Sequence, residues 1–146
     1  MTPSASPSSV LVCTDFSSRS GLALQRAQRL SQVMQAPLEV LHVMGGAVLD
    51  DLRDWLGMGG TAEQALLDDA QQQASAWLQA WGAGGSAAAD VRVVSGHAVA
   101  EIVSHIRQSG AELVLVGARG EGDLLRMVVG STAERLLRRT QTPLLV

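Results

Sequence analysis

The sequence contains no lysine and no tyrosine, and aromatic residues make up only 3% of its 146 positions. All eleven basic residues are therefore arginines. This excludes a lysine nucleophile, a Schiff base and the lysine-containing phosphate loop G-x-x-x-x-G-K-[ST]. The net charge is −3, whereas nucleic-acid-binding domains usually carry a basic face. The composition argues against lysine chemistry and against nucleic acid as a partner.

Cysteine and long apolar runs are equally scarce. Cys13 is the only cysteine, so no internal disulfide can form and a reducing compartment fits the chain. It lies inside an apolar run without a basic neighbour, so we expect a buried core residue rather than a reactive thiol. No stretch approaches the ~20 apolar residues of a membrane span, and residues 1–9 lack the apolar segment of a signal peptide. We expect a cytoplasmic protein with a disordered tail at 1–7 and a single domain over 8–146.

What the sequence does contain is a regular succession of apolar strands and amphipathic helices. The strands are short branched runs without polar alternation, which is typical of parallel strands buried on both faces. Apolar residues at helical spacing predict a helix between each pair of strands. Strands are expected at 9–14, 38–44, 91–94, 112–117 and 143–146, and helices from Ser17 or Ser18 to about 35, at 61–81, at 97–110 and from 131. This order indicates an α/β fold, an open five-stranded parallel sheet with helices on both faces.

The most unusual segment follows the fourth predicted strand, at the carboxyl edge where open parallel sheets bind ligands. It reads G-A-R-G at 117–120, then nine further residues, then G-S-T at 130–132. Glycines permit tight turns and close approach of a ligand. Consecutive backbone N–H groups and a helix N-terminus both attract anions. The segment predicts a phosphate site, although Ser131 and Glu134 also form the S-x-x-E pattern of an ordinary helix cap.

The spacing G-x-x-G, nine residues, G-[ST] resembles the motif of the nucleotide-binding members of the universal stress protein family. The resemblance extends from about Val10 to Val146 and includes T-D-F-S at 14–17, L-H-V at 41–43 and T-P-L-L-V at 142–146. It implies the strand order 3-2-1-4-5 and a homodimer joined through the C-terminal strand at 143–146. It also implies binding of ATP together with Mg²⁺ or Mn²⁺.

The resemblance assigns roles to individual residues. It implies that Asp15 lies beside the adenosine and that Val43 meets the adenine through its backbone. The residues implied to hold the ribose and the phosphates are Gly117, Arg119, Gly120, Gly130, Ser131 and Thr132. From the residues alone, Asp15 can also be a turn or capping aspartate, and Arg119 a solvated loop arginine.

The expected function is nucleotide-dependent regulation in a stress response. Nothing in the glycine-rich segment resembles a general base with a second residue to orient it, so catalysis is not expected. Two alternatives stay open: a slow Mg²⁺-dependent ATPase or adenine-nucleotide hydrolase on the same fold, and a dimerisation module that binds no nucleotide.

Histidines and tryptophans offer few further site residues. His42 is predicted to be a satisfied core histidine, His105 a helix-surface residue, and His97 a surface residue near the ligand edge. The three lack the spacing of metal ligands. The tryptophans are predicted to pack in the core or an interface, with Trp55 a candidate to cover the nucleotide or to meet a partner.

Overall fold

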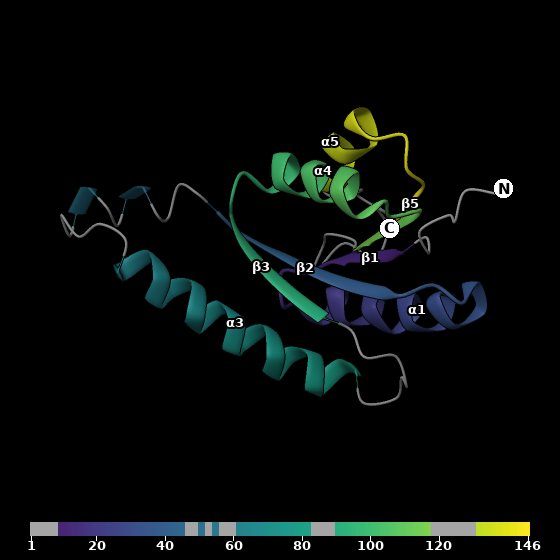
Figure 1. The fold of residues 1–146 in the computed structure, drawn as a ribbon, viewed down its shortest axis with the longest axis horizontal. Coiled ribbons are helices and arrows are strands. Elements are labelled where there is room, and N and C mark those ends of the chain that lie inside the picture. The colour runs from purple at the N-terminus through teal and green to yellow at the C-terminus, as the bar shows by residue number, and fades with distance from the viewer. Residues whose placement is uncertain (1–8, 46–49, 52–53, 56–60, 83–89, 118–130) are drawn as a thin grey trace, which may run out of the picture.

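The computed structural model describes residues 9–45, 50–51, 54–55, 61–82, 90–117 and 131–146. Over these residues strands and helices alternate as the sequence predicts (Figure 1). The strands are β1 (Val10–Cys13), β2 (Leu38–Gly45), β3 (Asp90–Gly96), β4 (Leu113–Val116) and β5 (Leu144–Leu145). The helices are α1 (Ser18–Met34), α3 (Thr61–Gly82), α4 (Ala98–Ser109) and α5 (Ser131–Arg139).

The strands form one parallel five-stranded sheet in the order β3-β2-β1-β4-β5, which confirms the predicted fold class and strand order. β1 lies at the centre, where it pairs with β2 on one side and with β4 on the other. Helices α1 and α3 cover one face of the sheet, and α4 and α5 cover the other (Figure 1). All four residues of β1 are buried as a consequence.

Two apolar cores form because successive strand residues point to opposite faces. Val10 and Val12 face α1 and α3, where Leu24 and Trp77 meet them. On the other face, Leu11 and Cys13 pack against residues of α4 and α5, among them Ile102, Ile106 and Leu136. The uninterrupted apolar sequence of β1 is thus explained by burial on both faces.

Helix α1 begins where its sequence provides a cap. The side chain of Ser17, one of the two predicted cap residues, accepts a hydrogen bond from the backbone N–H of Ser20. The helix ends at Met34, because Gln35 adopts a left-handed conformation with φ of 52° just before Ala36-Pro37.

Helices α1 and α3 approach each other closely at a glycine. A methyl group added to Gly21 would lie only 2.3 Å from Cδ2 of Trp81, so the glycine allows the indole ring to lie directly on α1. The side-chain amide of Gln28 also donates to the carbonyl of Gly82, at 3.3 Å. Trp77 is 7% exposed, and together these contacts confirm the predicted packing role of Trp77 and Trp81.

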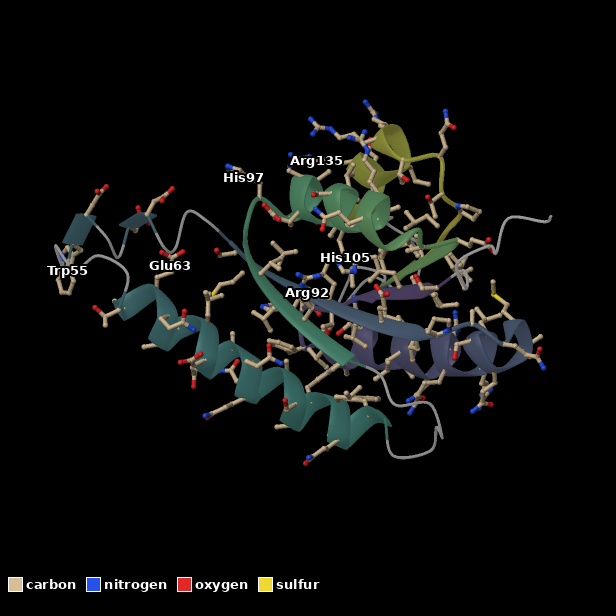
Figure 2. The ribbon with its side chains drawn as sticks, in the orientation of Figure 1. Trp55, Glu63, Arg92, His97, His105 and Arg135 are labelled. Atoms are coloured by element: carbon tan, nitrogen blue, oxygen red, sulfur yellow. The ribbon has the colours of Figure 1, made fainter. Side chains whose placement is uncertain are left out.

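Trp55 behaves differently from the other two tryptophans. Its side chain is 85% exposed, and it lies apart from the sheet (Figure 2). It therefore takes no part in the core, and the suggestion that it covers a nucleotide or meets a partner stays a prediction.

The sheet has edges at β3 and β5. Along β3, the backbone groups of residues 91, 93 and 95 face away from β2, because hydrogen-bonding direction alternates along a parallel strand. The side-chain amide of Gln71, on α3, donates to the outward-facing carbonyl of Val91 at 3.1 Å. A helix side chain therefore occupies part of this edge.

One sequence prediction about α4 is wrong. His105 was expected on the helix surface, but its side chain is only 12% exposed, and its Nε2 lies 2.8 Å from Oε2 of Glu39 on β2. The helix turns this histidine towards the sheet (Figure 2). The sequence misleads here because Glu39 is a polar residue inside an apolar strand, and a polar partner beneath α4 makes an inward histidine favourable.

Candidate functional site

A network of hydroxyl groups shapes the turn that follows β1. The Thr14 Oγ1 and Ser20 Oγ atoms lie 2.9 Å apart, and Ser20 Oγ also donates to the carbonyl of Ser17 at 2.9 Å. Thr14 Oγ1 accepts the backbone N–H of Phe16 at 2.9 Å. Thr14 and Ser20 are buried, so their hydroxyls are satisfied within the turn instead of by water. The turn is thereby fixed to the first turn of α1.

Asp15 projects from this turn at the carboxyl edge of the sheet and is exposed. Its Oδ1 accepts the backbone N–H of Ser17 at 3.0 Å. Partial burial acts to raise the pKa of Asp15, but hydrogen bonds from Ser17 and from the Ser20 side chain outweigh it and hold the pKa below the usual 3.8. The side chain is therefore a carboxylate at neutral pH, with one oxygen engaged in the turn.

The lowered pKa predicts how acid changes stability. A depressed folded-state pKa contributes stability that is fully present above the unfolded-state value and is lost as pH falls through the folded-state value. Asp15→Asn keeps an oxygen acceptor but has no charge to lose. We expect the wild type to exceed this variant in free energy of unfolding near neutral pH, and the difference to shrink below about pH 4. Urea unfolding at a series of pH values measures it, and a difference that grows in acid contradicts the assignment.

Aromatic side chains from β2 and α3 pack against the turn that carries Asp15. The Phe16 ring stacks on the imidazole of His42, with ring centroids 4.1 Å apart, and lies 6.1 Å from the Trp77 ring. Trp77 Nε1 also donates to the carbonyl of Ser17, at 3.4 Å. Phe16 adopts φ of 65°, which is uncommon for a bulky residue. The turn is thus held in a restricted conformation by contacts with β2 and α3.

His42 is hydrogen-bonded as predicted. Its Nδ1 lies 2.8 Å from the carbonyl oxygen of Thr14, and its side chain is partly buried beneath Phe16. The sequence indicated a satisfied histidine but did not reveal the partner. The sequence also does not indicate that Phe16 meets His42 and Trp77, because no local pattern links positions so far apart in the chain.

Val43 lies beyond the last rung of pairing between β1 and β2. The paired residues end at Cys13 and Leu41, with one further bond from the N–H of Thr14 to the carbonyl of Leu41 at 2.9 Å. The side chain of Val43 packs at the margin of the α4–α5 core. Its backbone and the carboxylate of Asp15 therefore lie at the same carboxyl edge, next to the same turn.

Gly117 follows β4 and packs directly against the start of α1. A methyl group at this position would lie 3.0 Å from the backbone nitrogen of Ser20 and 3.2 Å from the carbonyl carbon of Arg19. Backbone atoms in a capped helix turn cannot move aside easily. Gly117 therefore has a structural reason to be glycine, whether or not it faces a ligand.

The remainder of the predicted phosphate site is only partly described. Arg119, Gly120 and Gly130 lie outside the described residues. Ser131 is the first residue of α5, although its side chain is not described, and Thr132 in the same turn is half-buried. Ala133 and Leu136 anchor this helix in the core. The helix thus begins at Ser131, as the sequence predicts.

The other candidate groups contribute little chemistry. Cys13 is buried, which raises the pKa of its thiol to about 12 and confirms the prediction of an inert core residue. His97 precedes α4 and is exposed, and its side chain makes no capping hydrogen bond. Within the described ranges, no group of three or more His, Cys, Asp or Glu residues is placed to hold a metal ion.

No helix in the described part of the chain is both long and apolar enough to cross a bilayer. The longest, α3, has only three buried residues and carries Asp68 and Asp69 on its exposed surface.

Comparison with known proteins places the whole domain in one family. Residues 8–146 match the model of the universal stress protein family. The chain is 27% identical over 153 residues to universal stress protein YxiE of Bacillus subtilis, covering 94% of this chain and 96% of the relative.

Two solved structures share the fold. One is a universal stress protein in complex with cAMP, with a TM-score of 0.59, 23% identity and 97% of both chains covered. The other is the universal stress protein from Archaeoglobus fulgidus in complex with dAMP, with a TM-score of 0.65, 17% identity and 94% of both chains covered. Since the family model spans nearly the entire sequence, the chain belongs to the universal stress protein family.

Proposed function

We propose that this chain is a cytoplasmic, dimeric regulator that binds ATP with Mg²⁺ or Mn²⁺ at the carboxyl edge of β1, β2 and β4. Binding of the nucleotide presents a surface to a partner in a stress response. The observation that carries the proposal is that Asp15, held by the turn, and Val43 both follow the paired ends of β1 and β2 at the carboxyl edge of the sheet.

The adenosine end of the ligand suits these two groups. An adenine ring has both a hydrogen-bond donor and acceptors along its edge, so it can pair with the N–H and C=O of one extended residue such as Val43. The low pKa of Asp15 keeps this side chain an acceptor at neutral pH, which suits the hydroxyls of a ribose. The hydroxyl network beneath Asp15 keeps the carboxylate in place before the ligand arrives.

The phosphate end suits the start of α5. Nine residues of helix bring free N–H groups and a positive dipole end to Ser131 and Thr132. Gly130 and the G-A-R-G sequence at 117–120 add backbone donors, and Arg119 adds a planar cation suited to phosphate. No cluster of acidic residues in the described chain suits a divalent ion on its own, so the ion is held mainly by the phosphates themselves.

Relatives support an adenine nucleotide as the ligand. Two family members of the same fold have been solved with cAMP and with dAMP. Both ligands share an adenine base and a phosphate with ATP. The adenine base, which all three nucleotides share, is the part of the ligand that we assign to Val43.

A regulatory role fits better than catalysis. The hydrogen-bond partners of Asp15 in the described chain are hydroxyls and backbone N–H groups of its own turn. None of these can act as the second half of an acid–base pair. The proposed homodimer joins copies through β5 and residues 143–146, where Leu145 and Val146 are each 39% exposed.

Calorimetric titration with ATP and AMP, in the presence of Mg²⁺, tests the nucleotide site. We expect the wild type to bind both, and Gly130→Val to lose ATP affinity by at least about tenfold because the valine side chain fills the space of the distal phosphates. AMP lacks those phosphates and serves as the internal control, so its affinity should change less. A folded wild type that binds neither nucleotide overturns the proposal and favours the dimerisation module.

A further inference from the structure

At the end of the β1–β2 pairing, a side chain takes the place of the next backbone hydrogen bond. The N–H of Val10 bonds to the carbonyl of Pro37, and the N–H of Thr14 bonds to the carbonyl of Leu41. The backbone N–H and C=O groups of the odd-numbered residues of β2 therefore point towards β1. In a parallel ladder the next bond would run from the N–H of Val43 to the carbonyl of Thr14. That bond is not among the backbone pairs of the described residues.

The imidazole of His42 bonds to the Thr14 carbonyl in place of the Val43 N–H. Nδ1 of His42 lies 2.8 Å from the carbonyl oxygen of Thr14. A carbonyl oxygen can only accept, so Nδ1 carries the proton and donates it to this bond. The Thr14 carbonyl is thereby satisfied by a side chain. The backbone N–H of Val43, which points to the β1 side beyond the end of that strand, makes no bond to that carbonyl.

The same ring also sets the conformation of the turn that carries Asp15. The Phe16 ring stacks on the imidazole of His42, and the Phe16 backbone has a left-handed φ of 65°. The backbone N–H of Phe16 donates a hydrogen bond to Thr14 Oγ1. His42 therefore acts on both halves of the adenosine site: on the Val43 backbone through the hydrogen bond, and on the Asp15 turn through stacking.

We propose that His42 is a positioning residue of the nucleotide site, which replaces a backbone donor in the β1–β2 ladder and so keeps the Val43 N–H available for an adenine ring. This inference rests on the nucleotide site proposed above. His42 would then raise the affinity for the nucleotide without touching it. A histidine that only fills space in the core would have no such effect.

Amide hydrogen exchange in the nucleotide-free protein tests the ladder. We expect the Val43 amide to exchange faster than the Leu41 amide in the wild type. In His42→Leu the donor is absent, so the Val43 N–H should close onto the Thr14 carbonyl and its exchange should slow by about tenfold. His42→Asn is the matched control, because its Nδ2 donor can replace Nδ1 and leave the Val43 amide exchanging fast. Similar Val43 exchange in all three proteins overturns the proposal.

Nitrogen NMR of the imidazole gives a readout that needs no variant. We expect Nδ1 of His42 to carry the proton when the ring is neutral, since its partner is a carbonyl. A neutral ring protonated at Nε2 instead overturns the proposal, even if both variants fail to fold.

AMP titration of the same three proteins separates this inference from the proposed function. We expect His42→Leu to bind AMP about tenfold more weakly than the wild type, and His42→Asn to stay within about threefold. Equal AMP affinity in the wild type and His42→Leu overturns the role of His42 alone. A wild type that binds no AMP or ATP overturns the nucleotide site, and the positioning role falls with it.

Discussion

Leu136→Ala should lower the free energy of unfolding by about 2–5 kcal/mol. The side chain is fully buried and packs in the α4–α5 core with Leu11 and Ile102. Truncation removes apolar contact and leaves a cavity that the β1 and α4 side chains cannot readily fill. Chemical denaturation followed by circular dichroism measures the loss.

Leu137 provides a matched control for this prediction. It is the next residue of the same helix, and its side chain is 53% exposed. Leu137→Ala removes the same atoms and raises helix propensity by the same small amount as Leu136→Ala, so we expect a change within about 0.5 kcal/mol. Equal losses in the two variants contradict the described docking of α5. Because α5 begins at Ser131, Leu136→Ala should also weaken ATP binding.

Gly117→Val should destabilise the nucleotide-free protein by about 3 kcal/mol, at the upper end for overpacking. Even a single methyl group would lie 3.0 Å from the Ser20 nitrogen, and valine adds two more carbons beyond it. The end of β4 and the start of α1 must then separate, which disturbs the Ser17 cap and the hydroxyl network of Thr14. Thermal and urea unfolding without nucleotide measure this effect.

Gly45→Val is the control for that substitution. Gly45 also lies at the carboxyl end of a strand, but a methyl group there meets nothing within 4 Å. We expect a change within about 0.5 kcal/mol, since valine is favourable in strands. If Gly117→Val is as stable as the wild type and loses only nucleotide affinity, then the glycine serves the ligand and not the packing of α1.

The fold was largely predictable because each element has a local cause. Continuous apolar runs predicted strands buried on both faces, and β1 is buried at every residue. Ser17 was one of two predicted caps and caps α1. The boundaries differ where pairing decides them. β3 runs from Asp90 to Gly96, beyond the predicted 91–94, because β2 extends alongside it to Gly45.

The surroundings of the site were less predictable because they depend on contacts between distant residues. The sequence pointed to Asp15 and Val43 through a family resemblance, but it did not indicate that His42 bonds to Thr14 across 28 positions. Likewise, the sequence predicts His105 on the helix surface, whereas the structure pairs it with Glu39. Polar residues within apolar strands, such as Glu39 and His42, are the signal that marks such inward contacts.

The bond from Gln71 to the Val91 carbonyl has a consequence for assembly. A parallel sheet can in principle add chains at both ends and grow into a fibre. At the β3 end, an α3 side chain already occupies one outward-facing carbonyl, which opposes the addition of another strand. If copies join through β5, the two remaining ends of the combined sheet are both β3 strands. In that arrangement both free ends carry the Gln71 bond, so we expect assembly to stop at two chains and not to continue as a polymer.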